Sequence, residues 1–315
     1  MVPSQPIHRE ALEGMTLEPR FGLFMSQANK SWSQVRDEFV LADDLGFDHA
    51  WLVDHLLDTD GPPDLPCLEA WTLLAAIARE TSRVRIGTLV TSNTYRHPSI
   101  LMKEAVTVDH LSDGRLILGL GAGWQLDEHR RYGIPLPPPG ERVDRLEEAI
   151  QVALLLMSGE PATFDGRYYR LDDARFEPRP VQQPRIPLLI AAHRPRMIAL
   201  AARYADQWDT FPEIAGTATE GVTESVPDRM ARFVAACRAA GRDPSTVRRS
   251  LWADASILES VDAYVGFVER HAALGFTDFT AVLPRGVANP TPVLVEIAER
   301  VIPELRRTLV VAEPG

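Results

Sequence analysis

The stretch that decides the fold runs from Val84 to Gly133: VRIGTLVTSNTYRHPSILMKEAVTVDHLSDGRLILGLGAGWQLDEHRRYG. Its hydrophobic pattern predicts a strand over 84–91, a helix that begins at Pro98, and a second strand over 115–120. Proline suits the first turn of a helix, and Asp113-Gly114 ends this one. Both strands are apolar on both faces, as parallel strands covered by helices are.

The same alternation continues along the chain. We predict the other strands at 20–25, 48–53, 187–191, 207–211, 247–253 and 277–283, and the other helices at 32–45, 67–80, 141–157, 195–204, 228–240, 260–274 and 291–307. Eight strands that alternate with eight helices over about 290 residues predict an α/β protein with a (β/α)8 barrel, a TIM barrel. A doubly wound sheet is the alternative, and the count of eight favours the barrel.

The barrel is expected to be a single domain over 20–315, after a flexible leader over 1–19. Residues 158–186 form an insertion between the fourth helix and the fifth strand, with a hairpin-like sequence, FDGRYYRL. The polar segment 212–227 is too long for a plain connection, so we predict a mobile or functional lid loop there.

Composition limits the partners. The chain has 315 residues, of which 45% are hydrophobic, and a net charge of −11, which argues against binding nucleic acid or an anionic membrane surface. No apolar run reaches the length of a membrane span, and the N-terminus has no signal-peptide core. Cys67 and Cys237 lie in predicted helices without metal-ligand spacing around them. We expect a cytoplasmic protein that binds a small molecule and no metal.

Chemically capable residues follow five of the strands. In a (β/α)8 barrel the active site lies at the carboxyl ends of the strands. The residues at these ends are Asp54-His55, Thr91-Ser92-Asn93, Gly121 to Trp124, Ala191 to Arg194, and Thr210-Phe211. They are therefore predicted to converge on one mouth of the barrel.

His55 is the best candidate for proton transfer, because histidine changes charge near neutral pH and Asp54 is adjacent to it. A histidine that merely bonds a loop carbonyl is the alternative, and the residues alone leave both open. Glu128 follows Trp124 on a helical turn and could face the pocket.

Two further motifs have alternative interpretations. The small residues Gly121, Ala122 and Gly123 either admit a flat ring to the mouth or only allow tight packing at the strand end. Arg194 precedes a helix that starts at Pro195, and the free amides of such a start make a phosphate site. Solvated arginines on a surface loop are the alternative there.

Several stretches, taken together, resemble the luciferase-like oxidoreductases. The resemblance is strong from Phe21 to Phe211 and weak in the rest of the chain. The stretches are LADDLGFDHAWLVDH (41–55), VRIGTLVTSNTYRHP (84–98), DHLSDGRLILGLGAGW (109–124), ERVDRLEEAI (141–150) and FDGRYYRLDDARFEPRPVQQPRIPLLIAA (164–192). The fold of this family is a (β/α)8 barrel with an insertion. Its members bind FMN or the deazaflavin coenzyme F420, and this chain is more similar to the F420 branch.

The resemblance implies hydride transfer between coenzyme F420 and a small organic substrate. An FMN-dependent monooxygenase and a non-catalytic flavin-binding protein are the alternatives. Barrels of this family commonly form homodimers, and the residues of this chain leave its oligomeric state open. The resemblance places His55 at the reacting centre, with Asp54 beside it, and a non-prolyl cis peptide near Leu89-Val90. Trp124, Glu128 and Phe211 would line the substrate pocket. The cofactor would lie against Leu89, Val90, Thr91, Asn93, Gly121, Ala122, Gly123, Ala191, Ala192, His193 and Arg194.

This sequence departs from the sugar-phosphate dehydrogenases of that branch at two places. Those enzymes have a tryptophan shortly after the Asp-His motif, where Leu56 to Thr59 follow here, and an acid where Trp124 stands. We therefore expect a substrate other than a sugar phosphate.

Overall fold

The computed structural model describes residues 17–59, 61–62, 64–212, 222–286 and 291–314. Most of the predicted leader (1–19) and of the predicted lid loop (212–227) lies outside these ranges, so both stay predictions.

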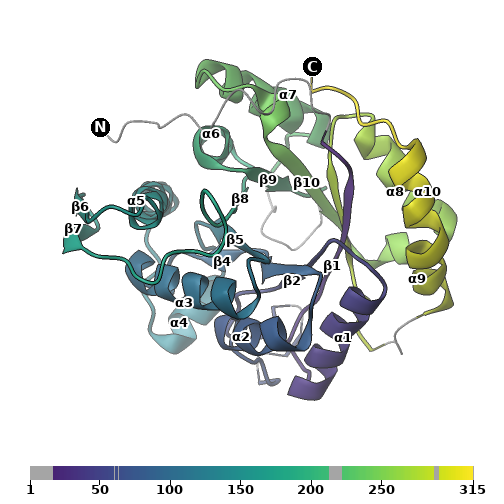
Figure 1. Cartoon of the computed structure of the whole chain (residues 1–315), viewed down its shortest axis with the longest axis horizontal. Coiled ribbons are helices and arrows are strands. Elements are labelled where there is room, and N and C mark those ends of the chain that lie inside the picture. Colours follow the sequence, from purple (N-terminus) through teal and green to yellow (C-terminus); the bar gives the residue numbers. More distant parts are fainter. Residues whose placement is uncertain (1–16, 60, 63, 213–221, 287–290, 315) are drawn as a thin grey trace.

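The strands close into a parallel barrel surrounded by helices (Figure 1). The order around the sheet is β3-β2-β1-β11-β10-β9-β8-β5-β4, and a further pairing of β3 with β5 closes it. β3 and β4 are two parts of one interrupted strand, so these strands fill eight positions, and the predicted (β/α)8 barrel is confirmed. The strands are β1 (Arg20–Phe24), β2 (His49–Leu52), β3 (Arg85–Thr88), β4 (Thr91–Ser92), β5 (Leu116–Gly121), β8 (Leu188–Ala191), β9 (Gln207–Thr210), β10 (Arg248–Ala253) and β11 (Asp278–Val282).

The interruption between β3 and β4 lies where the resemblance places it. The Leu89-Val90 peptide bond is cis. The bulge between β3 and β4 approaches β5 so closely that only glycine fits at two positions of β5. A Cβ at Gly119 would lie 2.1 Å from the Thr88 carbonyl oxygen, and one at Gly121 would lie 2.6 Å from the Val90 side chain. Tight packing at the strand end therefore explains these two glycines without a bound ring.

The helices form the outer layer. They are α1 (Trp32–Asp44), α2 (Ala70–Glu80), α3 (Pro98–Leu111), α5 (Pro139–Met157), α6 (Pro195–Tyr204), α7 (Val226–Ala239), α8 (Val261–Ala272), α9 (Pro292–Glu296) and α10 (Ile302–Thr308), with a short extra helix, α4 (Leu126–Tyr132). No helix in the part that the structure describes is long and apolar enough to cross a membrane.

Two helix predictions need correction. α2 begins at Ala70 and not at Cys67, because the Glu69 side chain caps it by accepting hydrogen bonds from the Trp71 and Thr72 amides. Cys67 instead forms an isolated β-bridge with Ala28. The final helix is not continuous either: a π-helical turn over Ile297–Val301 separates α9 from α10. It lies just before Pro303, whose missing N–H interrupts the regular hydrogen-bond ladder.

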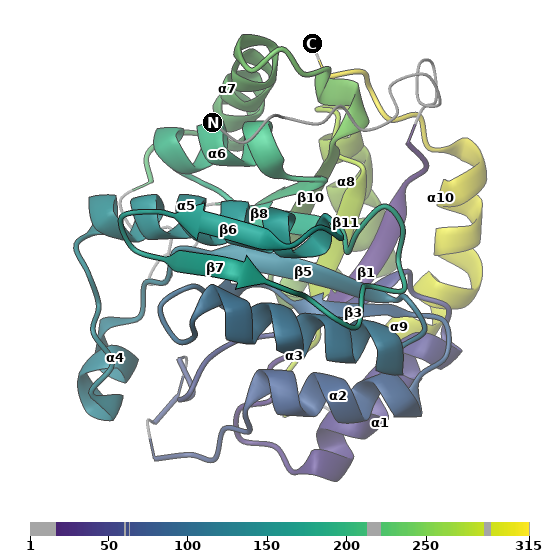
Figure 2. The same cartoon turned by 60° about the vertical axis from the view of Figure 1, so that its left-hand side comes forward.

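The predicted insertion contains an antiparallel hairpin, β6 (Ala162–Asp165) and β7 (Arg170–Ala174). It lies at the edge of the molecule beside α5 (Figures 1 and 2). Glu148 of α5 accepts hydrogen bonds from the amides of Arg167, Tyr168 and Tyr169 at 2.8–3.1 Å, which fixes the turn of the hairpin to that helix.

The core has two layers. The larger one fills the space between strands and helices, and a smaller cluster of Trp51, Leu89, Ile117 and Leu189 is separate from it. Trp51 of this smaller cluster donates a hydrogen bond to the buried His49, so polar side chains lie beside it. Phe24, Val90 and Trp252 pack on this smaller cluster and are only half-buried. These three side chains therefore give the barrel opening an apolar surface.

Candidate active site

His55 lies just beyond β2 and is bonded by an acid from a different part of the chain. Its Nδ1 is 2.8 Å from Oε2 of Glu128, which is on α4 and has 0% of its surface exposed. The other oxygen of Glu128 accepts hydrogen bonds from the amides of Leu56 and Leu57 at 2.7 and 2.9 Å. Tyr95 donates its hydroxyl to the same carboxylate. Glu128, which was expected to line the substrate pocket, is buried and contacts His55.

The protonation of this cluster follows from its donors. Burial acts to raise the pKa of Glu128, but the hydrogen bond from His55, the charge of His55 when it is protonated, and the hydrogen bonds from Tyr95 and the Leu57 amide outweigh it and hold that pKa below its ordinary value. Burial and the neighbouring Glu128 carboxylate raise the pKa of Tyr95, so its hydroxyl keeps its proton. An ionised Glu128 accepts only, so Nδ1 of neutral His55 carries the proton and Nε2 carries the lone pair.

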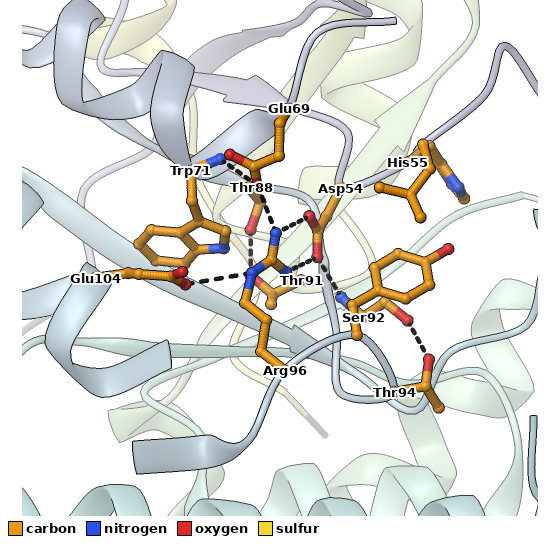
Figure 3. Close-up of polar contacts among 12 residues, drawn as sticks. Asp54, His55, Glu69, Trp71, Thr88, Thr91, Ser92, Thr94, Arg96 and Glu104 are labelled. Carbon is orange, nitrogen blue, oxygen red and sulfur yellow. Dashed lines mark hydrogen bonds and ion pairs between the residues drawn. The ribbon is translucent and has the colours of Figure 1, made fainter. Parts of the chain in front are cut away.

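Asp54 does not share this cluster. Its carboxylate accepts two hydrogen bonds from Arg96, at 2.7 and 3.0 Å, and one from the Ser92 amide at 2.9 Å. Figure 3 shows the Asp54 carboxylate and the His55 ring pointing in different directions. Asp54 therefore has other partners than His55, and the carboxylate that contacts His55 is that of Glu128.

The Arg96 guanidinium links four segments around the mouth. Besides Asp54 it pairs with Glu69, the N-cap of α2, at 2.5 Å and with Glu104 of α3 at 3.2 Å (Figure 3). Burial raises the pKa of Asp54, and the hydrogen bonds from Arg96 and Ser92 oppose that rise. Because Asp54 precedes His55 directly, this network fixes the start of the loop that carries the imidazole.

The segment after β5 carries the wall next to His55. Gly123 has a φ of +83°, and a Cβ there would lie 2.7 Å from the Thr94 hydroxyl oxygen. Trp124, which is 41% exposed, meets the His55 ring edge-on with centroids 5.7 Å apart. His129 of α4 bonds Thr94 at 2.7 Å. These contacts hold α4 over the loop that follows β4.

A second group of residues lies at the ends of β8 and β9. His193 Nδ1 is 3.0 Å from the Thr210 hydroxyl, and the buried Arg229 donates to that hydroxyl at 2.6 Å and to the Phe211 carbonyl at 2.8 Å. Burial, followed by the charge of Arg229, lowers the pKa of His193 to about 3, so its ring is neutral at physiological pH. The Phe211 ring packs on Trp252 with centroids 4.3 Å apart.

The start of α6 fits an anion. Its N-cap is Arg194, which provides no side-chain cap, and Pro195 is the first helical residue. The amides of the first turn therefore have no partner from a capping side chain. Arg196 does not add to this site, because it pairs with Asp144 of α5 at 2.5 Å.

Sequence analysis did not single out Tyr95, Trp252 or Arg229. The signal for Tyr95 was its place in the loop after the third strand, among residues already counted as chemically capable. Arg229 is on α7 and reaches the mouth only through tertiary packing, for which the sequence carries no signal. The parts of the chain that the structure describes contain no cluster of three or more metal-ligating side chains.

The model of the luciferase-like monooxygenase family matches residues 14–285. An F420-dependent glucose-6-phosphate dehydrogenase from Microbacterium testaceum is 37% identical over 62% of this chain, and an F420-dependent hydroxymycolic acid dehydrogenase from Mycobacterium tuberculosis is 32% identical over 82% of it. The chain spans 57% and 65% of the length of these two relatives. Among solved structures, the coenzyme F420-dependent tetrahydromethanopterin reductase from Methanopyrus kandleri superposes with a TM-score of 0.73 at 18% identity, over 91% of this chain and 99% of that one, which shows a shared fold.

Proposed function

Given that this chain belongs to the luciferase-like monooxygenase family, we propose that it is an oxidoreductase that uses coenzyme F420 to move a hydride to or from a small organic substrate. The names of two relatives that share 37% and 32% identity support F420 over FMN. The observation that carries the proposal is the His55–Glu128 hydrogen bond of 2.8 Å beside the partly exposed Trp124.

Three features of the mouth fit a flat ring with a phosphate. The half-buried and buried rings of Trp252 and Phe211 supply an apolar wall. Asn93 is 4% exposed, and its Oδ1 has no hydrogen-bond partner among the described residues, so a donor on a bound molecule would satisfy it. The uncapped start of α6 offers amides and partial positive charge to a phosphate.

These features assign roles. Asn93 and the segment from Ala191 to Arg194 would hold the coenzyme, as would Leu89, Val90 and Thr91 at the bulge and Gly121 to Gly123 at the end of β5, whereas Phe211 would line the substrate pocket. When bound, coenzyme F420 supplies the carbon centre that accepts or gives the hydride.

The chain's own residues manage the proton. In the direction of substrate oxidation, Nε2 of His55 takes the hydroxyl proton while the substrate loses its hydride. The Glu128 carboxylate stabilises the imidazolium that forms, and the Leu56 and Leu57 amides hold that carboxylate in place. Trp124 shields one side of the imidazole from water.

Titration of the purified protein with oxidised coenzyme F420 and with FMN, followed by fluorescence quenching, tests the proposal. We expect coenzyme F420 to bind at least tenfold more tightly, about 1.4 kcal/mol. Tighter binding of FMN would favour the monooxygenase alternative instead. Binding of neither would remove the basis for the proposal.

A further inference from the structure

A band of exposed apolar side chains borders the mouth next to His55. Trp124 is 41% exposed, Leu126 65% and Tyr132 55%, and they are three of the six large apolar residues that are exposed in the described part of the chain. The Tyr132 hydroxyl donates to the Leu56 carbonyl at 3.3 Å, which brings the half-buried Leu56 into the same band. We call Leu56, Trp124, Leu126 and Tyr132 the apolar rim.

The apolar rim adjoins the proton-transfer site through Trp124 and Leu56. Trp124 touches the His55 ring, and Leu56 follows His55 directly in the chain. The same α4 that exposes Leu126 and Tyr132 buries Glu128 against His55. A molecule whose reacting carbon lies at His55 would therefore place its remaining atoms on the apolar rim or on the apolar surface of the barrel opening.

Three aromatic rings add a further apolar surface to the mouth. Trp252 packs on Phe211 at 4.3 Å between ring centroids and on Phe24 at 5.6 Å. These three rings come from β10, from the end of β9 and from β1, and both Phe24 and Trp252 are only half-buried. Their exposed faces offer an apolar surface inside the barrel opening.

Cationic side chains around the mouth are engaged by other groups. Arg96 pairs with three carboxylates, and Arg229, which is 1% exposed, donates to Thr210 and Phe211. Lys30 pairs with Glu38 at 2.6 Å and Arg285 with Asp58 at 2.8 Å. An anionic substrate group would have to compete with these carboxylates, whereas a neutral apolar group would bury exposed apolar surface.

We propose that the substrate is a neutral alcohol with an apolar chain or ring, whose apolar part lies on the apolar rim. This inference rests on the proposed function, because it takes His55 as the proton acceptor. In the oxidation, the carbinol C–H bond breaks and its electron pair leaves with the hydrogen as hydride to coenzyme F420. The hydroxyl proton passes to His55, and the C–O bond becomes the carbonyl double bond.

The test is a chain-length series, 2-propanol, 2-hexanol and 2-octanol, with the F420-loaded protein. Burial of one methylene contributes about 0.8 kcal/mol, so KM should fall up to about fourfold for each methylene that reaches the rim. Trp124→Ser and Leu126→Ser should flatten this dependence. Val310→Ser, a matched change at a residue that is 83% exposed, should leave it unchanged.

Binding without turnover provides a second readout. Calorimetric titration with 2-octanone, with and without coenzyme, should show binding that Trp124→Ser weakens at least fivefold. A preference for glucose 6-phosphate over 2-octanol, or equal KM values along the series, would overturn the inference. The same holds if Trp124→Ser changes only the sedimentation of a dimer, because the rim would then be a contact between two copies.

The two proposals fail in different ways. If coenzyme F420 binds and is reduced but chain length has no effect, only the inference about the substrate is wrong. If coenzyme F420 does not bind, the proposed function is wrong, and the 2-octanone titration of the coenzyme-free protein still decides whether the apolar rim binds an apolar ligand.

Discussion

Replacing Glu128 by glutamine tests how the site controls the His55 proton. Oε1 of Glu128 receives two backbone amides, which can only donate. The amide side chain of the Glu128→Gln variant must therefore keep its oxygen there and turn its NH₂ group toward His55. Nδ1 of His55 would then have to accept, which moves the ring proton to Nε2 and removes the lone pair that takes the substrate proton.

The size of the effect follows from that change of tautomer. Loss of a positioned general base costs about 10²–10⁴-fold in turnover, or about 2.7–5.4 kcal/mol of activation free energy. Coenzyme affinity should change less than twofold, because Glu128 contacts His55, Tyr95 and the loop after β2. Steady-state kinetics and a coenzyme titration of the same preparation separate the two.

The adjacent acid Asp127 provides a matched control. It is on the exposed side of α4, where it pairs with Arg130 at 2.6 Å and with Arg131. Asp127→Asn should leave turnover within a factor of two, since exposed ion pairs of this kind contribute little. Turnover of Glu128→Gln within threefold of the unaltered protein would refute the proposed role of Glu128.

Three further changes probe the cofactor site and the supporting contacts. Arg194→Glu reverses a charge at the start of α6 and should weaken the binding of coenzyme F420 at least tenfold in a quenching titration. Unchanged affinity would place the phosphate elsewhere. Arg96→Met leaves the buried carboxylate of Asp54 without its guanidinium partner and should lower the free energy of unfolding in urea by about 3–5 kcal/mol, whereas a loss below 1 kcal/mol would contradict the network. His193 has a folded pKa of about 3, below its unfolded value of about 6.5, so the unfolded state binds more protons between these values and stability falls as pH falls. Between pH 6.5 and 5 this amounts to about 2 kcal/mol, and urea unfolding of His193→Asn should show a correspondingly smaller loss than the unaltered protein over that window.

The barrel could be predicted because each of its parts has a local signal. Parallel strands buried on both faces appear in the sequence as apolar runs, and most helices between them, α2 excepted, have proline at their starts or glycine after their ends. The start of α2 was misplaced because Cys67 and Leu68 are apolar and look helical, whereas the capping carboxylate of Glu69 sets the boundary. Local composition did not show that choice.

The partner of His55 could not be predicted with the same security. Asp54 is next to it in the chain, but consecutive residues of an extended segment point to opposite sides, so adjacency was a weak argument for contact. Glu128 is 73 positions away and reaches His55 only because His129 and Thr94 hold α4 over the following loop. Contacts of this kind depend on how a short helix packs, and the hydrophobic periodicity of the sequence does not predict that packing.

The small residues after β5 show a different limit. The composition of the segment from Gly121 to Gly123 suggested either a bound ring or tight packing, and the structure places the Val90 side chain where a Cβ at Gly121 would be. Within β5, the Thr88 carbonyl likewise lies where a Cβ at Gly119 would be. The family resemblance located the cis peptide at Leu89-Val90 that these glycines accommodate. Composition alone would not have located it.

Single-turnover reduction of bound coenzyme F420 by 2-octanol, in the unaltered protein and in His55→Asn, tests the central claim most directly. Loss of coenzyme absorbance reports hydride transfer, and a prior titration shows that both proteins are equally loaded. We expect His55→Asn to bind the coenzyme with nearly unchanged affinity and to reduce it about 10²–10⁴-fold more slowly. Equal reduction rates at equal loading would show that His55 is structural and would contradict the account.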